Sequence, residues 1–292
     1  MRMIHSVGSI RLGQPMNLFI GLDMQLMFEA IPLLFAIAVS AWLVSLVIED
    51  ISIVDYFWSL MLLGSAATYA YRISVESSLS TVNLVLLLMI AVWALRLSGF
   101  LILRGRNRGE ERRYRAMRKK LTPSFALKSL INVFLFRALL IWLLSSLFVV
   151  ALSSGPSLSW SHWHTVGAAL WLFGFTMEAL ADLQLHRFNQ LVVRGSETLN
   201  SGLWRYSRHP NYFGECCVWC GWVVFAIPSA SAATLPWLLL APIIMITLLL
   251  KLSGISHMER GITQRRPDYR QYIETTSAFI PWKPAQKIGI DL

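Results

Sequence analysis

Residues 202–215, GLWRYSRHPNYFGE, gather many side chains that could do chemistry into a short stretch. They include two arginines, a histidine, two tyrosines and an asparagine, and the stretch ends on Glu215. The apolar run that follows directly has a length typical of a membrane helix. Hydrogen-bond donors at the mouth of such a helix, next to an acid just inside it, indicate a polar binding site rather than a lipid-facing surface.

Other ionisable side chains also fall inside apolar runs, where each costs about 2.5–3.5 kcal/mol on insertion scales. They are Glu29, Asp55, Arg96, Glu178 and Asp182. Taken singly, each is explained by a charge near a helix end that reaches the interface. Glu178 and Asp182, however, are four residues apart and share one helix face, where they repel each other unless cations meet them. Because Arg96, Arg205 and Arg208 can supply those cations, we expect a polar cavity that opens to the cytoplasm.

The residue types expected in this cavity suit a nucleotide-like cofactor. Arginines bind phosphate, carboxylates and asparagine suit ribose hydroxyls or an amide, and Trp204, Tyr206 and Tyr212 can stack on a flat ring. The set does not distinguish a nicotinamide dinucleotide from S-adenosylmethionine. The chain has no GxGxxG and no GxxxxGK[ST], which excludes a Rossmann turn and a P-loop.

The composition predicts an all-α, polytopic membrane helix bundle. The 292 residues are 55% hydrophobic and 14% charged, with a mean hydropathy of +0.55, whereas about a quarter of the residues of a soluble domain are charged. We predict seven spans within a single domain, 25–292, preceded by an N-terminal segment, 1–24. The predicted spans are 25–48, 53–71, 82–103, 129–152, 163–182, 212–230 and 234–252. The three cysteines all fall within 216–220 and indicate neither a disulfide framework nor a metal site.

The basic residues predict the orientation of the bundle. The net charge is +10, and segment 104–120 alone holds nine Lys and Arg against two Glu. Segment 183–211 is also basic, whereas 72–81 and 153–162 are nearly free of positive charge. Since cytoplasmic loops are enriched in Lys and Arg, we expect the N-terminus outside and the C-terminus inside, with 106–120 as a short helix at the membrane surface. This pattern favours a lipid bilayer as the partner over nucleic acid.

Several motifs together resemble the steroid 5-alpha-reductase superfamily, most closely its bacterial branch of uncharacterised membrane proteins. They are VDYFW at 54–58, WALRLSG at 93–99, EERRY at 110–114, EALADLQLHRF at 178–188, GLWRYSRHPNYFGE at 202–215, LLLKLSGISHMER and RRPDYRQYIETTSAFIPW. The resemblance covers roughly residues 50–283. It implies a seven-helix reductase of the bacterial inner membrane that uses NADPH, with the cofactor held on the cytoplasmic side by the C-terminal half, about 129–283.

The resemblance also assigns cofactor contacts residue by residue. With Tyr212, the expected cofactor-binding residues are Arg96, Glu178, Asp182, Arg205, Tyr206, Arg208, His209, Asn211, Glu215, Glu259, Tyr269 and Tyr272. The last three belong to the C-terminal segment, which would close the site.

The expected catalytic residues depart from the family's pattern. The eukaryotic steroid reductases engage the substrate ketone with a glutamate and a tyrosine. Asp55 stands in a comparable place in the second helix, whereas Trp93 takes the tyrosine's place and cannot act as an acid. We therefore expect Asp55 to be the catalytic acid, kept protonated by an apolar wall, and Tyr56 to substitute for the tyrosine.

Three functions follow from these residues. The first is NADPH-dependent reduction of the activated C=C bond of a hydrophobic enone, steroid-like or lipid-like, taken from the bilayer. The alternative is an S-adenosylmethionine-dependent methyltransferase of the isoprenylcysteine or phospholipid type, because those enzymes carry a similar RHPxY element. The third, a non-enzymatic lipid or sterol carrier, leaves the polar residues of 178–215 unexplained. The sequence gives neither the substrate nor the oligomeric state.

Overall fold

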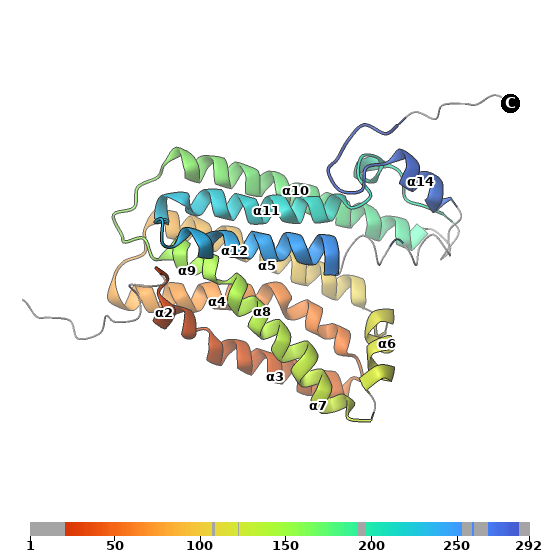
Figure 1. The fold of residues 1–292 in the computed structure, drawn as a ribbon, viewed down its shortest axis with the longest axis horizontal. Helices are drawn as coiled ribbons and strands as arrows, with labels where there is room; N and C mark the ends of the chain where they lie inside the picture. Colours follow the sequence, from red (N-terminus) through yellow and green to blue (C-terminus); the bar gives the residue numbers. More distant parts are fainter. Residues whose placement is uncertain are drawn as a thin grey trace, which may run out of the picture.

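The structure is a computed structural model that describes residues 21–106, 109–121, 123–191, 197–252, 259 and 268–285. Within these ranges the chain is helical and forms no strand, which confirms the predicted all-α class. Figure 1 shows the long helices lying side by side in a bundle, with α10 and α3 at opposite edges of the view. The predicted segment 1–24 lies almost entirely outside the described residues.

The N-terminal half supplies three spans and then returns through a fourth that is divided into several helical segments. Its elements are α2 Met24–Phe28, α3 Ile31–Val47, η1 Ile51–Ile53, α4 Val54–Glu76, α5 Thr81–Gly105, α6 Arg112–Leu121, α7 Phe125–Ser129, η2 Leu130–Leu135, α8 Phe136–Leu144 and α9 Ser146–Leu152. Side chains cap several of these starts: Asp23 accepts a hydrogen bond from the N–H of Leu26, and Ser80 accepts one from Asn83.

The C-terminal half contains two long helices, a shorter apolar one and a tail. Its elements are α10 His162–Leu191, η3 Gly202–Arg205, α11 Pro210–Ala226, η4 Ile227–Ser229, α12 Leu235–Thr247, η5 Leu248–Leu252 and α14 Tyr269–Thr275. Proline at the first position of α11 starts that helix with a residue that lacks an N–H, where no partner is needed.

Six helices among the described residues are long and apolar enough to cross a membrane. They are Met24–Val47, Ile51–Glu76, Thr81–Gly105, Phe125–Leu152, His162–Leu191 and Pro210–Ser229. These match the first six predicted spans, although two of them run further than predicted, to Glu76 and to Leu191. The extensions carry polar residues that hydropathy excludes. The seventh predicted span corresponds to a shorter apolar helix, Leu235–Leu250, so the count of seven and the orientation stay predictions.

Helices α10 and α11 pack at very short range because each carries glycines on the shared face. A Cβ added to Gly174 would lie 2.6 Å from the carbonyl oxygen of Gly214, and one added to Gly214 would lie 2.6 Å from the N of Glu178. Gly167 and Gly221 make equally close approaches further along the pair. Small residues allow this kind of backbone contact in membrane proteins, and here the contact brings the acids of the two helices together.

The polar elements gather at one end of the bundle. Figure 1 shows α6 and α14 at the same end, near the C-terminal end of α5 and the start of α11. The short helix predicted within 106–120 is present as α6, Arg112–Leu121, and its place at the membrane surface stays a prediction.

Candidate cofactor site

A buried cluster of charges joins α5 to α10 near this polar end. The Nη1 of Arg96 donates to Asp182 Oδ2 at 2.9 Å, and the Nη2 of Arg96 forms an ion pair with Glu178 Oε1. The exposed fractions of these side chains are 17%, 7% and 5% for Arg96, Asp182 and Glu178. Phe175 lies beneath the guanidinium, 5.6 Å from its ring centroid. The prediction that a cation meets the two acids is therefore realised by Arg96.

Helix α11 adds two more of the predicted residues to the same cluster. Asn211 Nδ2 donates to the free oxygen of Asp182 at 3.2 Å. Glu215, one turn further, accepts indole N–H bonds from Trp93 at 3.0 Å and from Trp219 at 2.9 Å, one on each carboxyl oxygen. Three separate spans thus converge on one polar centre.

Several buried polar atoms of the cluster are not fully hydrogen-bonded. Among the described residues, Arg96 Nε and Nη2 and Glu178 Oε2 have no hydrogen-bond partner of good geometry. Buried polar groups in native proteins almost always find partners. These atoms leave the cluster with hydrogen-bonding capacity that the described residues do not use.

Asp55 lies in a different environment from the apolar wall that we predicted. Its carboxyl forms ion pairs with Arg113 of α6 and with Arg137 of α8, the latter at 2.6 Å, and it accepts a hydrogen bond from the hydroxyl of Tyr114 at 3.0 Å. The apolar wall expected around Asp55 is therefore wrong, because the basic segment folds back over the start of α4. Its catalytic role stays a prediction.

The segment around α6 is fastened to the bundle by further polar contacts. Glu110 receives the side chain of Arg118 at 2.8 Å and the N–H of Ile51 at 3.2 Å. Burial alone would raise the pKa of Glu110, but these two partners lower it. Burial is also the main reason that the pKa of Tyr114 is raised, so its hydroxyl stays a donor to Asp55. Asp55 and Glu110 together hold α6 across the end of the bundle.

Tyr56 lies against the end of α5 rather than beside Arg96. A Cβ added to Gly105 would meet the Tyr56 hydroxyl at 1.9 Å, and the Tyr56 carbonyl accepts a bond from Ser98 at 2.7 Å. Its catalytic role stays a prediction.

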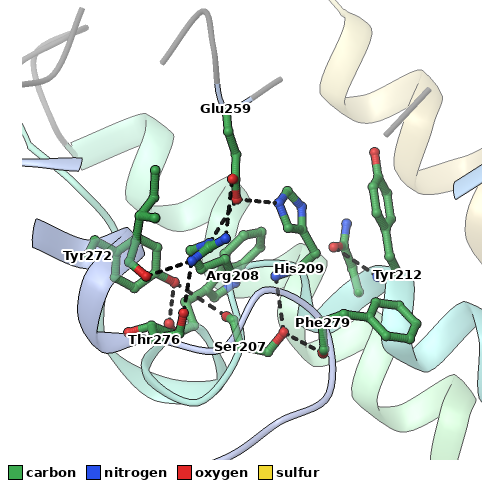
Figure 2. Close-up of polar contacts among 11 residues, drawn as sticks. Ser207, Arg208, His209, Tyr212, Glu259, Tyr272, Thr276 and Phe279 are labelled. Atoms are coloured by element: carbon green, nitrogen blue, oxygen red, sulfur yellow. Dashed lines mark hydrogen bonds and ion pairs between the residues drawn. The ribbon is translucent and has the colours of Figure 1, made fainter. Parts of the chain in front are cut away.

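The arginine and histidine of the 202–215 stretch hold the C-terminal segment. Arg208 Nε donates to Glu259 at 2.8 Å, and its Nη1 donates to the carbonyls of Ile273 at 2.8 Å and Thr276 at 3.0 Å. His209 Nε2 lies 3.2 Å from the same carboxyl oxygen of Glu259. Figure 2 shows these side chains pointing toward one another. We call Arg208, His209, Glu259 and residues 268–285 the clasp.

Other contacts strengthen the clasp. The hydroxyl of Tyr272 donates to the carbonyl of Trp204, and Ser207 donates to the carbonyl of Phe279 at 2.7 Å (Figure 2). Tyr269 packs on Tyr272 with 5.5 Å between ring centroids. Burial raises the pKa of Tyr272, so its hydroxyl stays protonated as a donor. Among the described residues Arg208 contacts Glu259 and two backbone carbonyls, which gives it a role in the clasp, and its predicted contact with a cofactor stays a prediction.

Three more predicted residues lie near the clasp. Tyr212 stacks on His209 with 5.4 Å between ring centroids. Arg205 and Tyr206 are exposed. Arg205 lines a polar surface hollow of about 460 Å³ together with Glu197, Thr198, Asn200, Asp268, Gln271, Tyr272, Thr275, Thr276 and Pro284. No residue of the Arg96 cluster lines this hollow.

The chain matches a family described as "Protein of unknown function (DUF1295)" over residues 41–276. The chain belongs to this family. DUF1295 is known to lie within the steroid 5-alpha-reductase-like superfamily, so the resemblance seen in the motifs is supported at the level of the superfamily.

A relative of the DUF1295 chain occurs in a yeast. This chain is 24% identical over 262 residues to the uncharacterized protein C594.04c of Schizosaccharomyces pombe. The match covers 82% of this chain and 75% of the relative. No solved structure matches. The bacterial origin implied by the motifs stays a prediction.

Three residues of the DUF1295 site escaped the sequence prediction. Nothing in the sequence marked Trp219 as a site residue, because tryptophan is common in apolar helices. Its position four residues after Glu215 matters only because its indole N–H donates to that carboxyl. Arg113 lies in the EERRY motif, and Arg137 is a lone cation in the fourth predicted span. The rule that intramembrane charges find partners could have connected Arg137 with Asp55.

The described residues contain no group of three or more His, Cys, Asp or Glu placed to hold a metal ion. The three cysteines of α11 are free thiols.

Proposed function

We propose that this DUF1295 protein is an NADPH-dependent membrane reductase acting on the activated C=C bond of a hydrophobic enone. The observation that carries the proposal is the convergence of Arg96, Glu178, Asp182, Asn211 and Glu215 from three spans on one buried polar centre with unpartnered atoms. A chain that only carried lipid would have no use for such a centre, since every charge in it is costly to bury.

The donor set of the centre fits the polar end of a nicotinamide dinucleotide. Glu178 Oε2 can accept from an amide or a hydroxyl, and Arg96 Nε can donate to an oxygen. The cofactor supplies a hydride when bound. Arg205 is exposed and has no ion pair among the described residues, so it is the member of the 202–215 stretch left to meet a phosphate.

The remaining residues exclude water and orient the polar groups. Trp93, Trp219, Trp222 and Phe148 pack edge to face or stacked around Glu215 and close the inner side of the centre with apolar rings. A water-poor site strengthens hydrogen bonds to a developing negative charge on the substrate. The apolar spans around it offer a route for a hydrophobic substrate from the bilayer.

One observation favours the alternative, an S-adenosylmethionine-dependent methyltransferase. Arg208, an expected phosphate ligand, is occupied by Glu259 and by backbone carbonyls. A sulfonium cofactor needs no cation for a 2′-phosphate, so the loss of Arg208 from the binding set removes one argument against it.

The experiment that separates the two is a thermal shift of the purified, detergent-solubilised protein. We expect NADPH to raise the melting temperature, NADH to raise it less, and S-adenosylmethionine to leave it unchanged. Stabilisation by S-adenosylmethionine and not by NADPH would reverse the assignment. Comparing lipid extracts of cells with and without the protein then identifies the substrate as the species that gains two hydrogens.

Asp55 gives a second test of the reductase proposal. Asp55→Asn leaves Arg113 and Arg137 without their shared carboxylate and loosens α6. We expect turnover to fall strongly because α6 loosens. The NADPH-induced thermal shift should persist, because the described residues show no hydrogen bond or ion pair between Asp55 and the Arg96 cluster. Glu111→Gln, at an exposed carboxyl of the same segment, is the matched control and should retain turnover. Unchanged turnover in Asp55→Asn would remove Asp55 from the mechanism.

A further inference from the structure

The segment that follows α14 presents two large apolar side chains to the surroundings. Ile280 and Trp282 have exposed fractions of 60% and 74%. The backbone around them is nevertheless held in place, because the N–H of Trp282 donates to the carbonyl of Tyr206 at 2.9 Å and the carbonyl of Phe279 accepts a bond from Ser207 at 2.7 Å. These bonds lie on either side of Ile280, so the exposure of both side chains is part of the fold.

A row of aromatic rings connects this segment with the long helices. Phe279 packs edge to face on Phe213 of α11, with 5.7 Å between ring centroids, and Phe213 packs in the same way on Phe173 of α10, at 6.4 Å. Phe173 is half exposed on a helix that is long and apolar enough to cross a membrane. The row therefore runs from the exposed side of α10 to the segment that carries Ile280 and Trp282.

The level of this row along α10 coincides with the end of a predicted membrane span. Phe213 precedes Gly214, and a Cβ added to Gly214 would lie 2.6 Å from the N of Glu178. Glu178 falls near the C-terminal end of the predicted span 163–182. Helix α10 has 30 residues and is about 45 Å long, whereas the hydrocarbon core is about 30 Å thick, so its last turns extend beyond the core. Phe279, packed on Phe213, thus lies where hydrocarbon gives way to headgroups.

The residue types of the segment suit this level of a bilayer. Tryptophan is enriched at membrane–water interfaces, because its ring is apolar while its indole N–H needs a polar partner. Ile280 offers apolar area beside Trp282. Lys283 follows directly and is exposed, and a cation at this position attracts the phosphates of anionic lipids.

We propose that residues 279–283 form an interfacial anchor, in which Ile280 and Trp282 insert into the headgroup region of the leaflet at the polar end of the bundle. The partner is the lipid surface itself. Arg208 fastens the clasp to the protein, and the anchor fastens the same segment to the membrane. The bilayer therefore contributes to keeping the clasp closed, whichever reaction the protein catalyses.

Photocrosslinking of the full chain in its native membranes tests the contact with lipid. A benzophenone amino acid is placed at position 282 in one variant and at position 271 in a matched control, since Gln271 lines the polar hollow. After irradiation and purification, mass spectrometry should show about fivefold more phospholipid adduct at position 282 than at position 271. Equal lipid labelling at the two positions overturns the anchor. Adducts at 282 with a second copy of the chain or with another protein, in place of lipid, also overturn it.

Two substitutions of Trp282 separate anchoring from a structural role of the indole. Trp282→Glu places a charge at the interface, whereas Trp282→Tyr removes the same indole but keeps an aromatic ring that favours the interface. In nanodiscs of phosphatidylcholine and phosphatidylglycerol, we expect a protease to cleave within 268–285 several times faster in Trp282→Glu than in the wild type. Trp282→Tyr should match the wild type. Cleavage of Trp282→Glu at the wild-type rate, or of Trp282→Tyr as fast as Trp282→Glu, would contradict the anchor.

Discussion

Arg96 and Arg208 are both largely shielded from solvent and face carboxylates, yet their surroundings differ. Arg208 donates to both oxygens of Glu259 and to two backbone carbonyls, so each of its three nitrogens is used. Arg96 shares one guanidinium between Glu178 and Asp182 of α10. In the described part of the chain its Nη2 has only the ion pair with Glu178, and its Nε has no hydrogen-bond partner. One arginine is satisfied by the protein and the other is not.

The difference separates an arginine whose donors the protein uses from one that keeps a donor for the proposed cofactor. Fully paired buried charges fix a geometry, and here they hold the C-terminal segment onto the 202–209 loop. A cluster with unpaired atoms and surplus acids is costly unless another molecule completes it. The sequence placed both arginines in one category, because residue type and neighbourhood alone do not reveal how many donors are already used.

Breaking the clasp should have the largest effect on stability. Arg208→Ala removes the guanidinium that pairs with Glu259 and leaves two backbone carbonyls without their donor. We therefore expect the free energy that holds the clasp closed to fall by about 3–5 kcal/mol. Limited proteolysis should show cleavage within 268–285 at far lower protease concentration. The matched control is Arg205→Ala, an exposed neighbour, for which we expect a change within about 0.5 kcal/mol. If residues 268–285 resist protease equally well in Arg208→Ala and Arg205→Ala, Arg208 does not hold the clasp.

A substitution that forces α10 away from α11 should disturb the Arg96 cluster instead of the clasp. Gly214→Ala places a methyl 2.6 Å from the N of Glu178, and we expect about 1–3 kcal/mol of destabilisation together with weaker NADPH binding. Gly99→Ala is the control, since its added Cβ meets nothing within 4 Å. It should be neutral or stabilising by about 1 kcal/mol, because alanine favours the helix. A thermal melt of both variants with and without NADPH distinguishes these results.

Acid should loosen the clasp by a smaller and graded amount. Burial tends to raise the pKa of Glu259, but hydrogen bonds from His209 and Arg208 outweigh it and the pKa is lowered. A carboxyl whose pKa is lower in the folded state stabilises the folded clasp at pH values above the ordinary glutamate pKa, about 4.3. This stabilisation is lost as the pH falls through the folded-state pKa of Glu259. Protease protection of 268–285 should therefore fall below about pH 4. Glu259→Gln should lack this pH dependence; if it retains the wild-type profile, another group controls the clasp.

Much of the fold followed from hydropathy, and its limits are instructive. The first six predicted spans correspond to helices, because about 20 apolar residues have few alternatives. Spans two and five were predicted too short. Arg72 pairs with Glu29 at 3.0 Å, and the residues beyond Asp182 continue α10 as a polar extension at the end of the bundle. Polar residues with partners lengthen a helix that a hydropathy window ends.

The candidate site was predictable as a set of residues but not as a set of roles. The spacing of Glu178 and Asp182, and the need for a cation, led to Arg96, Arg205 and Arg208, and the structure pairs the first of these with both acids. The apolar wall expected for Asp55 failed because α6 returns over it with Arg113, a contact across 58 positions of sequence that no local pattern encodes. Trp93 was seen only as an absent tyrosine, whereas in the structure its indole N–H holds Glu215.

The most direct test of the account is equilibrium binding of NADPH to the purified protein and to Arg96→Gln. Arg118→Gln, which removes a cation paired with Glu110 in the α6 segment, is the control. We predict that Arg96→Gln weakens NADPH binding at least tenfold, about 1.4 kcal/mol, while Arg118→Gln binds within twofold of wild type. Equal NADPH affinity in the wild type and Arg96→Gln would contradict the claim that the unsatisfied cluster is where the cofactor binds.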